Sequence, residues 1–170
     1  LLTDFGSKGG HYVASMKGII LKINPNVNII DISHEITPFS TIEASYVLKT
    51  TYKHFPKNTI FIIVIDPGVG SKREILVIKI KSGYYLIGPN NGIFSDIIFE
   101  EISECVLVQN YKYFNKPISS TFHGRDIMAP VGAHLANGVP LNNFGPEFSI
   151  ENLVSNPIVY EWFEKENIIK

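Results

Sequence analysis

The sequence contains one cysteine, Cys105, and it has neither a long apolar run nor a run of basic residues. A single cysteine excludes a disulfide framework and a cysteine-based zinc site, and it is typical of a protein of the reducing cytosol. No stretch approaches the roughly 18 uninterrupted apolar residues of a membrane span, so we expect no membrane partner. The formal net charge is −1. Without a Lys/Arg cluster that could follow a phosphate backbone, we also expect no nucleic-acid partner.

The chain does contain enough apolar sequence for one folded domain. Of its 170 residues, 45% are hydrophobic and 12% are aromatic, which excludes intrinsic disorder. A domain of this length buries roughly 70% of the surface of its unfolded chain, so it needs no disulfide or metal to be stable. The sequence begins with Leu1 rather than Met and ends at Lys170, just after an apolar pair. We therefore expect a piece of a longer protein.

Short runs rich in Val and Ile alternate with segments of helical periodicity. The apolar runs predict buried strands over residues 27–32, 60–65, 75–80, 84–87 and 106–108. Apolar spacing and capping signals predict helices over residues 12–23, 40–54 and 126–137. Lys81-Ser82-Gly83 predicts a hairpin turn. This alternation predicts a layered α/β/α domain with a mixed, mostly parallel sheet over residues 1–146, followed by a linker over residues 147–170.

Polar sequence follows four of the predicted strands, where open α/β sheets bind their ligands. The four polar blocks are Thr3–Gly10, Asp66–Arg73, Pro89–Gly92 and Ser120–Asp126. Each block also has a purely structural interpretation. The aspartates and the Asn-Asn-Gly sequence are common turn formers, and they could serve only to shape the chain.

The two arginines favour a functional interpretation. The sequence has 13 lysines but only two arginines, Arg73 and Arg125, and both lie in these polar blocks. A rigid guanidinium is well suited to hold an anion or a carboxylate. Asp66, Arg73 and His123 therefore form a candidate polar cluster at the strand ends.

Two other kinds of site are poorly supported. Gly68-Val69-Gly70 lacks the Gly-Lys-Ser/Thr ending of a phosphate-binding loop. His123, Asp126 and His134 are loosely spaced and have no cysteine partner, so we expect no metal.

Six sequence blocks, taken together and in order, resemble one family, the S-adenosyl-L-methionine (SAM) hydrolases, also called SAM hydroxide adenosyltransferases. The resemblance runs from Leu1 to about Gly145. Its blocks are Thr3–Gly6, Met16–Gly18, Asp31–Pro38, Asp66–Gly70, Pro89–Gly92 and Thr121–Asp126. This family is related to the SAM-dependent fluorinase and chlorinase.

The resemblance implies hydrolysis of SAM to adenosine and L-methionine, with no metal or organic cofactor. Water or hydroxide would attack C5′ of the ribose, and a neutral thioether would leave, so no general acid is needed. The difficulty is the nucleophile, because bulk water has a pKa of about 15.7. The attack also destroys charge, which a dry and preorganised site favours.

By the same resemblance, specific residues receive roles. Asp66, Arg73 and His123 form the water-activating set. Arg73 stabilises hydroxide character, while Asp66 and His123 orient the water and one of them takes its proton. Asp4 would bind the two ribose hydroxyls, since a carboxylate accepts two hydrogen bonds from a diol.

Three further residues are implied substrate contacts: Phe39, Phe122 and Asn91. Phe39 alternatively is a partly buried aromatic of a loop. The loop over residues 7–11 resembles the family less well, because it is longer by one residue and lacks an acidic residue near the methionine amino group.

Other functions are less well supported. Related halogenases have Tyr-Pro at the positions of Asp66-Pro67, and Tyr-Ser at the positions of His123-Gly124. They also carry an insertion before the Pro-Asn-Asn-Gly strand, which is absent here. Two further alternatives are a module that binds SAM or adenosine without turnover, and a metal phosphoesterase that uses Asp4, Asp66, His123 and Asp126.

The resemblance also implies a second, smaller β-barrel-like domain, which this sequence does not contain. In the family that domain supplies much of the adenine pocket, and the active sites lie between subunits of a trimer. We therefore expect a homotrimeric, cytoplasmic protein in its full-length form, of which this chain is the N-terminal catalytic domain.

Overall fold

A computed structural model of the chain describes residues 1–97, 101–156, 162–163 and 168–169. Its centre is a five-stranded sheet in the order β1-β2-β4-β3-β5. The strands are β1 (Leu2–Thr3), β2 (Ile60–Val64), β3 (Ile75–Ile80), β4 (Tyr85–Pro89) and β5 (Ile102–Leu107). Strand β2 is parallel to β1 and β4, whereas β3 is antiparallel to β4 and β5. Strand β3 is thus the one reversed strand of this sheet.

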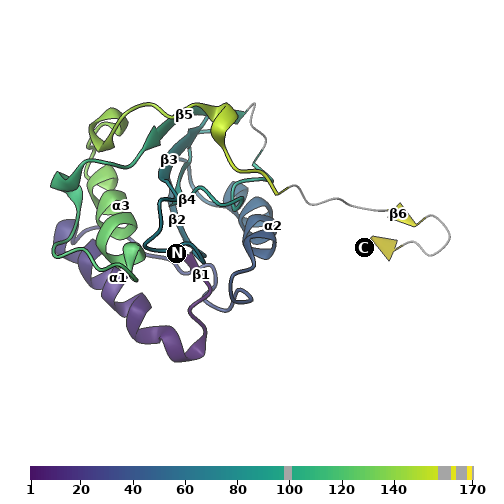
Figure 1. Ribbon diagram of the computed structural model, residues 1–170, viewed down its shortest axis with the longest axis horizontal. Helices are drawn as coiled ribbons and strands as arrows, with labels where there is room; N and C mark the ends of the chain where they lie inside the picture. Colours follow the sequence, from purple (N-terminus) through teal and green to yellow (C-terminus); the bar gives the residue numbers. More distant parts are fainter. Residues whose placement is uncertain (98–100, 157–161, 164–167, 170) are drawn as a thin grey trace.

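Helices cover both faces of the sheet (Figure 1). Helices α1 (Gly10–Ile23) and α3 (Ala129–Ala136) lie on one face, and α2 (Thr41–Thr51) lies on the other. Strand β2 shows why both faces are needed. Ile62 and Val64 pack in the cluster beneath α1 and α3, while Phe61 and Ile63 pack in the cluster beneath α2. Side chains that alternate between two buried faces produce a continuous apolar run. The predicted α/β/α layering and mixed sheet are confirmed.

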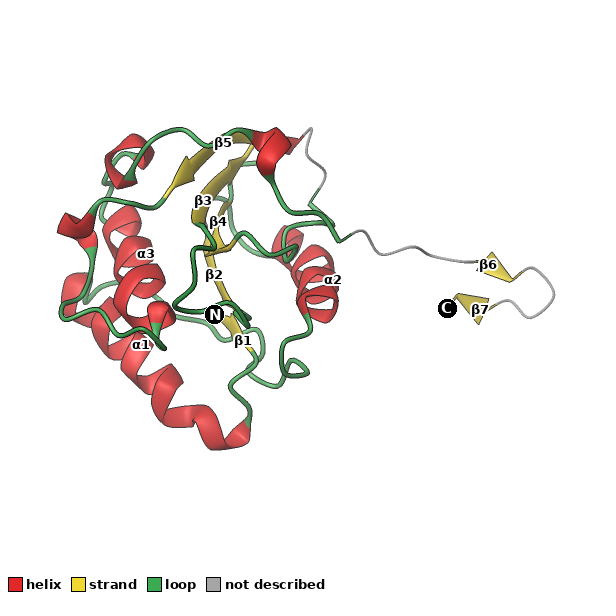
Figure 2. Cartoon of the chain, in the orientation of Figure 1, coloured by secondary structure: helices red, strands yellow, loops and turns green. Residues whose placement is uncertain are grey.

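The helices begin close to where the sequence predicts them. Ser40 caps α2 by accepting a hydrogen bond from the backbone N–H of Glu43, at 3.3 Å. A 3-10 turn over Tyr52–His54 then completes the predicted helix. The third predicted helix is divided into a π-helical turn over Gly124–Met128 and α3 (Figure 2). The hairpin turn between β3 and β4 is also present, and Gly83 adopts a φ of 93° there.

The predicted strand over residues 27–32 is wrong. This segment lies beside β1, where Leu1 N donates to Ile30 O at 2.6 Å and Ile32 N donates to Leu1 O at 2.8 Å. A single parallel bridge, Leu2 to Ser33, follows. Strand β1 has only two residues, so it offers too short an edge for residues 27–32 to pair as a strand.

Strand β5 begins earlier than predicted, at Ile102 instead of Val106. Its residues Ser103 and Glu104 are exposed at the edge of the sheet, so they interrupt the apolar run used to find it. Beyond Gly145 the chain still contacts β5, since Phe148 N donates to Cys105 O at 2.8 Å. The predicted linker also contains the two-residue antiparallel strands β6 (Trp162–Phe163) and β7 (Ile168–Ile169). The predicted domain boundary at residue 146 stays a prediction.

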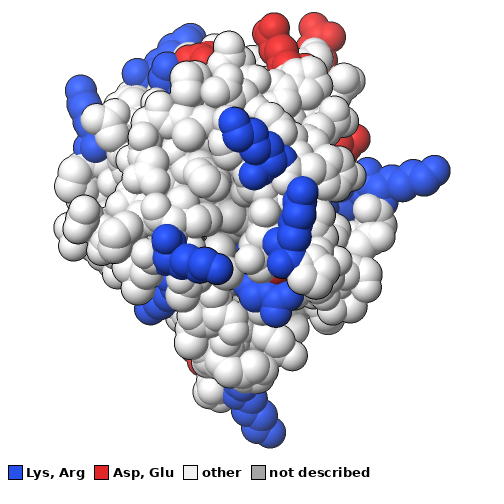
Figure 3. Space-filling model, turned by 90° about the vertical axis from the view of Figure 1, so that its left-hand side faces the viewer, with Lys and Arg blue, Asp and Glu red and all other residues white. Residues whose placement is uncertain are grey.

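Within the part of the chain that the structure describes, none of the helices combines the length and the apolar character needed to cross a bilayer. Charged side chains are also dispersed on the face formed by α1 and α3. Figure 3 shows isolated Lys and Arg side chains there, separated by uncharged surface. This differs from the continuous basic stripe of a surface that follows a phosphate backbone.

Candidate functional site

A cavity of about 220 Å³ lies at the carboxyl ends of β1 and β2. Five of the residues predicted to act in the site line it: Asp4, Phe39, Asp66, Phe122 and His123. They come from four separate segments of the chain. Their convergence follows from the parallel pairing of β1 and β2, which brings two strand ends to the same edge of the sheet.

Asp66 and Arg73 form a buried ion pair beside this cavity. The Arg73 Nε donates to both carboxylate oxygens of Asp66, at 2.8 and 3.0 Å, and Arg73 Nη2 also donates to Asp66 Oδ2. The two side chains are only 5% and 11% exposed, respectively. A buried ion pair needs such multiple hydrogen bonds to offset the cost of removing both charges from water.

His123 extends this pair to the cavity wall. Arg73 Nη2 lies 2.9 Å from His123 Nδ1. A guanidinium can only donate, so Nδ1 is the acceptor, and the proton of the neutral ring is on Nε2. Burial, and then the positive charge of Arg73, lower the pKa of His123, although Asp66 and Asp126 partly oppose this. The ring is therefore neutral near pH 7 and can donate from Nε2.

Two glycines allow the segments of the site to approach one another. Gly70 has a φ of 79°, and a Cβ there would lie 2.3 Å from the backbone oxygen of Ser120. A Cβ on Gly124 would lie 3.0 Å from the side chain of Val64 on β2. The first contact joins the Asp66–Arg73 loop to the segment before His123, and the second brings that segment against the sheet.

Asp4 and Phe39 also line the cavity. Asp4 Oδ2 accepts a hydrogen bond from the backbone N–H of Phe39 at 2.8 Å. This bond holds Phe39 in the left-handed region, at a φ of 66°, where residues other than glycine are uncommon. The Phe39 ring is 66% exposed, so it forms the rim of the cavity and not part of the core.

His34 supports the loop that carries Asp4. Its Nδ1 lies 2.9 Å from Thr3 Oγ1, and its backbone oxygen accepts from Gly6 N at 2.7 Å. Thr3 is fully buried. His34 belongs to the Asp31–Pro38 block, and its contact with Thr3 depends on the pairing of segments 31 residues apart, which no local pattern indicates.

Aromatic side chains surround Phe122. Its ring makes edge contacts with Phe5 and Tyr12, at centroid distances of 5.9 and 5.1 Å, and the Arg125 guanidinium lies 5.0 Å from the ring centre. Such edge-to-face and cation–π contacts favour one ring orientation. Tyr12 was predicted only as the start of a helix, and its place near the cavity follows from the fold alone.

Arg125 and Asp126 form a second, structural pair. Asp126 is completely buried and accepts from Arg125 Nε at 2.7 Å, from Arg125 Nη2 at 2.9 Å, and from Ser119 N and Asn115 Nδ2. Burial alone would raise the pKa of Asp126, but these donors lower it. The carboxylate thus orders the segment that precedes His123, and the anion held by Arg125 is its own neighbour in the sequence.

Asn91 lies outside the cavity lining. Its Nδ2 donates to the backbone oxygen of Ile65 at 2.8 Å, immediately before Asp66. Its Oδ1 is buried and has no hydrogen-bond partner among the described residues. The structure therefore brings six of the seven predicted site residues to the cavity or its ion pair, and Asn91 contacts Ile65, the residue between β2 and Asp66.

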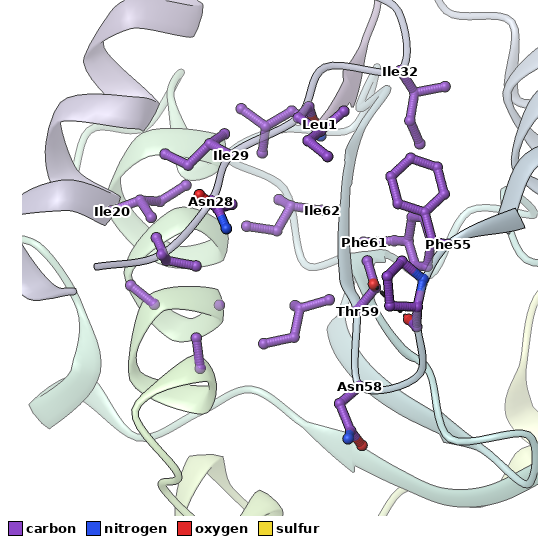
Figure 4. A pocket seen from close by; sticks show the side chains of 17 residues that line it. Leu1, Ile20, Asn28, Ile29, Ile32, Phe55, Asn58, Thr59, Phe61 and Ile62 are labelled. Atoms are coloured by element: carbon purple, nitrogen blue, oxygen red, sulfur yellow. Dashed lines mark hydrogen bonds between the residues drawn. The ribbon is translucent and has the colours of Figure 1, made fainter. Parts of the chain in front are cut away.

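A larger cavity, of about 410 Å³, lies at the other end of β2 (Figure 4). It is lined by apolar side chains such as Ile29, Ile62 and Phe61, with Asn28, Asn58 and Thr59 as polar exceptions. None of its lining residues has an ionisable side chain. The smaller cavity is the better candidate because it combines charge, a neutral imidazole and concave shape.

The described residues contain no group of three or more His, Cys, Asp or Glu side chains that could hold a metal ion. Asp66 and Asp126 instead bind arginines. Cys105 is buried, and burial raises the pKa of its thiol to about 12, so it is not a nucleophile at neutral pH.

Comparison with known proteins gives a consistent result. Residues 1–145 match the family model described as the SAM hydroxide adenosyltransferase N-terminal domain. The (R)-S-adenosyl-L-methionine hydrolase of Methanocaldococcus jannaschii is 49% identical over 140 residues, which are 79% of this chain and 51% of the hydrolase. A fluorinase of Actinoplanes is more distant, at 30% identity over 90% of this chain and 59% of the fluorinase.

A solved structure of an uncharacterized conserved protein from Thermotoga maritima superposes with a TM-score of 0.88. It is 41% identical, and the match covers 93% of this chain and 60% of that protein. The chain thus spans only about half to three-fifths of the length of these relatives.

Proposed function

The chain belongs to the SAM hydroxide adenosyltransferase family, whose N-terminal domain it represents, and on this premise we propose that the full-length protein hydrolyses SAM to adenosine and L-methionine. The observation that carries the proposal is the contact among Asp66, Arg73 and His123 at the wall of one cavity. Similarity to a hydrolase at 49% identity, against 30% for a fluorinase, supports water over halide as the nucleophile.

In the proposed reaction, the oxygen of water attacks C5′ of the ribose while the bond between C5′ and the sulfonium sulfur breaks. The bonding electron pair stays on sulfur, giving the neutral thioether of methionine, and the water loses one proton to give the 5′-hydroxyl of adenosine. Positive charge therefore moves from sulfur to the attacking oxygen and leaves with the proton. A preorganised carboxylate and guanidinium beside that oxygen need little reorganisation during this transfer.

His123 orients the water, and Asp66 takes its proton. Nδ1 of His123 already accepts from Arg73, and Nε2 already carries the proton, so neither nitrogen of the neutral ring is a base. The Nε2–H instead donates to the water oxygen. Once C5′ is attacked, that oxygen becomes strongly acidic, so even the weakly basic carboxylate of Asp66 accepts its proton.

Arg73 holds this arrangement together electrostatically. It has five N–H donors, of which three serve Asp66 and His123. Its permanent charge favours hydroxide character on the water and keeps His123 neutral.

Asp4, Phe39 and Phe122 are proposed substrate contacts. Asp4 would accept hydrogen bonds from the ribose hydroxyls. The exposed Phe39 ring and the Phe122 ring would cover the nucleoside, because aromatic rings bury large apolar area at fixed geometry. The role of Asn91 is indirect, since it contacts Ile65 and not the cavity.

The cavity in this domain is incomplete for such a substrate. Its volume of about 220 Å³ is below the roughly 300–1,000 Å³ typical of small-molecule sites. The exposed Phe39 marks an open side. We therefore propose that a second domain, contributed within a homotrimer of the full-length protein, encloses the substrate there.

The test uses the full-length protein incubated with SAM, followed by chromatography of the nucleosides. We expect adenosine and methionine in equal amounts without added halide. With Asp66→Asn, the rate of adenosine formation should fall at least about 100-fold, because the proton acceptor is removed. A new nucleoside formed only with chloride or fluoride would establish a halogenase instead. Tight SAM binding by calorimetry without adenosine would indicate a binding module, and phosphate-ester cleavage lost with a chelator would indicate a phosphoesterase.

A further inference from the structure

The turn Pro89-Asn90-Asn91-Gly92 contacts a late part of the chain, residues 152–156, which we call the exit segment. Asn90 is 6% exposed and uses both ends of its amide on this segment. Its Nδ2 donates to Asn152 O at 3.2 Å, and its Oδ1 accepts from Val154 N at 2.9 Å. The Asn90 side chain thus pairs with the exit segment as a neighbouring backbone peptide would.

Asn156 makes a second set of contacts, one with the same turn and one with Ser95, three residues after it. Its Nδ2 donates to Asn91 O at 3.2 Å, and its backbone N donates to Ser95 Oγ at 2.6 Å. Gly92 has a φ of 95°, and a Cβ there would lie 2.2 Å from Asn156 Nδ2. A glycine is therefore required for this close approach. Leu153, which lies between the two residues that Asn90 binds, is buried in the cluster beneath α2.

The same turn also contacts the candidate site from behind. Asn91 Nδ2 donates to Ile65 O at 2.8 Å, and Ile65 is fully buried. The next residue is Asp66, which binds Arg73, which in turn binds His123. One turn thus links the exit segment to the strand end that carries the ion pair.

We propose that Asn90 and Asn91 are positioning residues that together fix the exit segment to the carboxyl end of β2. Asn90 binds the exit segment, and Asn91 binds Ile65. Residues 152–156 are thereby held at a fixed place relative to the cavity. This linkage requires no substrate, so it does not rest on the proposed hydrolysis.

The first experiment substitutes Asn90→Asp, which keeps the shape but removes the donor to Asn152 O. The new carboxylate would also face Glu74 Oε2, which lies 3.4 Å from Asn90 Nδ2. Hydrogen exchange of this chain should show the Val154 and Asn156 amides exchanging about 2- to 12-fold faster, because loss of one hydrogen bond shifts a local opening equilibrium by about that factor. Asn142→Asp, at an exposed position, is the matched control and should leave both amides unchanged.

Should Asn90→Asp fail to fold, Asn90→Ala removes both side-chain bonds to the exit segment without placing a carboxylate opposite Glu74, and it gives the same readout at the Val154 and Asn156 amides. Unchanged exchange at both amides in a folded variant would overturn the role of Asn90.

The second experiment substitutes Asn91→Ala and follows the His123 ring by NMR titration without SAM. Loss of the bond to Ile65 O should displace Asp66 and Arg73, and so shift the midpoint of the His123 titration, while that of His134 on α3 stays constant. A merely structural loss elsewhere would not act selectively on His123. An unaltered His123 midpoint would overturn the role of Asn91.

Discussion

Arg73 and Arg125 each bind one carboxylate through two nitrogens, Asp66 in the first case and Asp126 in the second. The first pair faces the cavity and continues to the neutral ring of His123. The second carboxylate is fully buried, and its remaining lone pairs accept from Ser119 and Asn115. Equal ion-pair chemistry thus serves the proposed reaction at one place and loop structure at the other. The two pairs differ in their further contacts, which are a neutral ring at the cavity in the first pair and loop donors in the second.

The largest effect should come from Asp126→Asn in the structural pair. The amide would keep the volume but lose the charge, and its NH₂ would face groups that themselves donate. Breaking a buried pair costs about 3–5 kcal/mol, so we expect the free energy of unfolding to fall by about that amount. Denaturant unfolding of this chain measures it. Asp66→Asn should cost less, since among the described residues the Asp66 carboxylate accepts only from Arg73, whereas Asp126 also accepts from Ser119 and Asn115. An equal loss in both variants would contradict the division of roles.

The next effect concerns turnover in the full-length protein. Arg73→Lys keeps the charge but loses the planar fork, so Asp66 and His123 can no longer be bound together. By analogy with the removal of one electrostatic donor, adenosine formation should fall about 100- to 1,000-fold. Arg125→Lys is the matched change and should reduce the rate less than about 10-fold. Similar losses in steady-state rate for the two variants would remove the contrast.

A smaller effect should separate Gly70 from Gly138. Both have positive φ, 79° and 83°, so Ala costs about 1–2 kcal/mol at either position. Only at Gly70 would the new Cβ also meet Ser120 O, whereas nothing lies within 4 Å at Gly138. Gly70→Ala should therefore lower the free energy of unfolding further than Gly138→Ala. Equal midpoints in denaturant would show that the two loops of the site are not in firm contact.

The smallest effect is on pH dependence. The pKa of His123 is lowered by burial and by Arg73, so the ring should titrate below its usual value of 6.5. Because a protonated ring cannot accept from Arg73, hydrolysis should be retained near neutral pH and lost as the pH falls through that lowered pKa. Stability should decline in the same direction, since the unfolded chain binds the proton more readily. NMR titration of His123 beside a pH–rate profile checks this, and a midpoint above 6.5 would contradict it.

The sequence predicts the fold well where local chemistry decides it. The Val/Ile runs of β2 and β3, the Ser40 cap and the Gly83 turn each depend on a few neighbouring residues. Residues 27–32 have an equally strong strand composition, but their pairing depends on the length of β1, which composition does not reveal.

The site is predicted less completely, for a similar reason. Polar blocks at strand ends place Asp66, Arg73 and His123 near one another, and the structure brings them into contact, while their roles stay predictions. The positive φ of Phe39 depends on Asp4, 35 residues away. Asn91 faces Ile65 and Asn156 through partners 26 and 65 residues distant, and no local pattern indicates them.

The reversed direction of β3 determines which residues can meet. Ile75, the first residue of β3, pairs with Pro89, the last of β4, so the amino end of β3 lies at the edge where β2 and β4 end. Arg73 precedes a strand and Asp66 follows one, yet both occupy the same edge. Had β3 run parallel to its neighbours, its six residues at about 3.3 Å each would have carried Arg73 about 20 Å to the opposite edge. The ten-residue connection over residues 65–74, which crosses the end of β4, thus brings the Asp66 carboxylate and the Arg73 guanidinium together with very little chain.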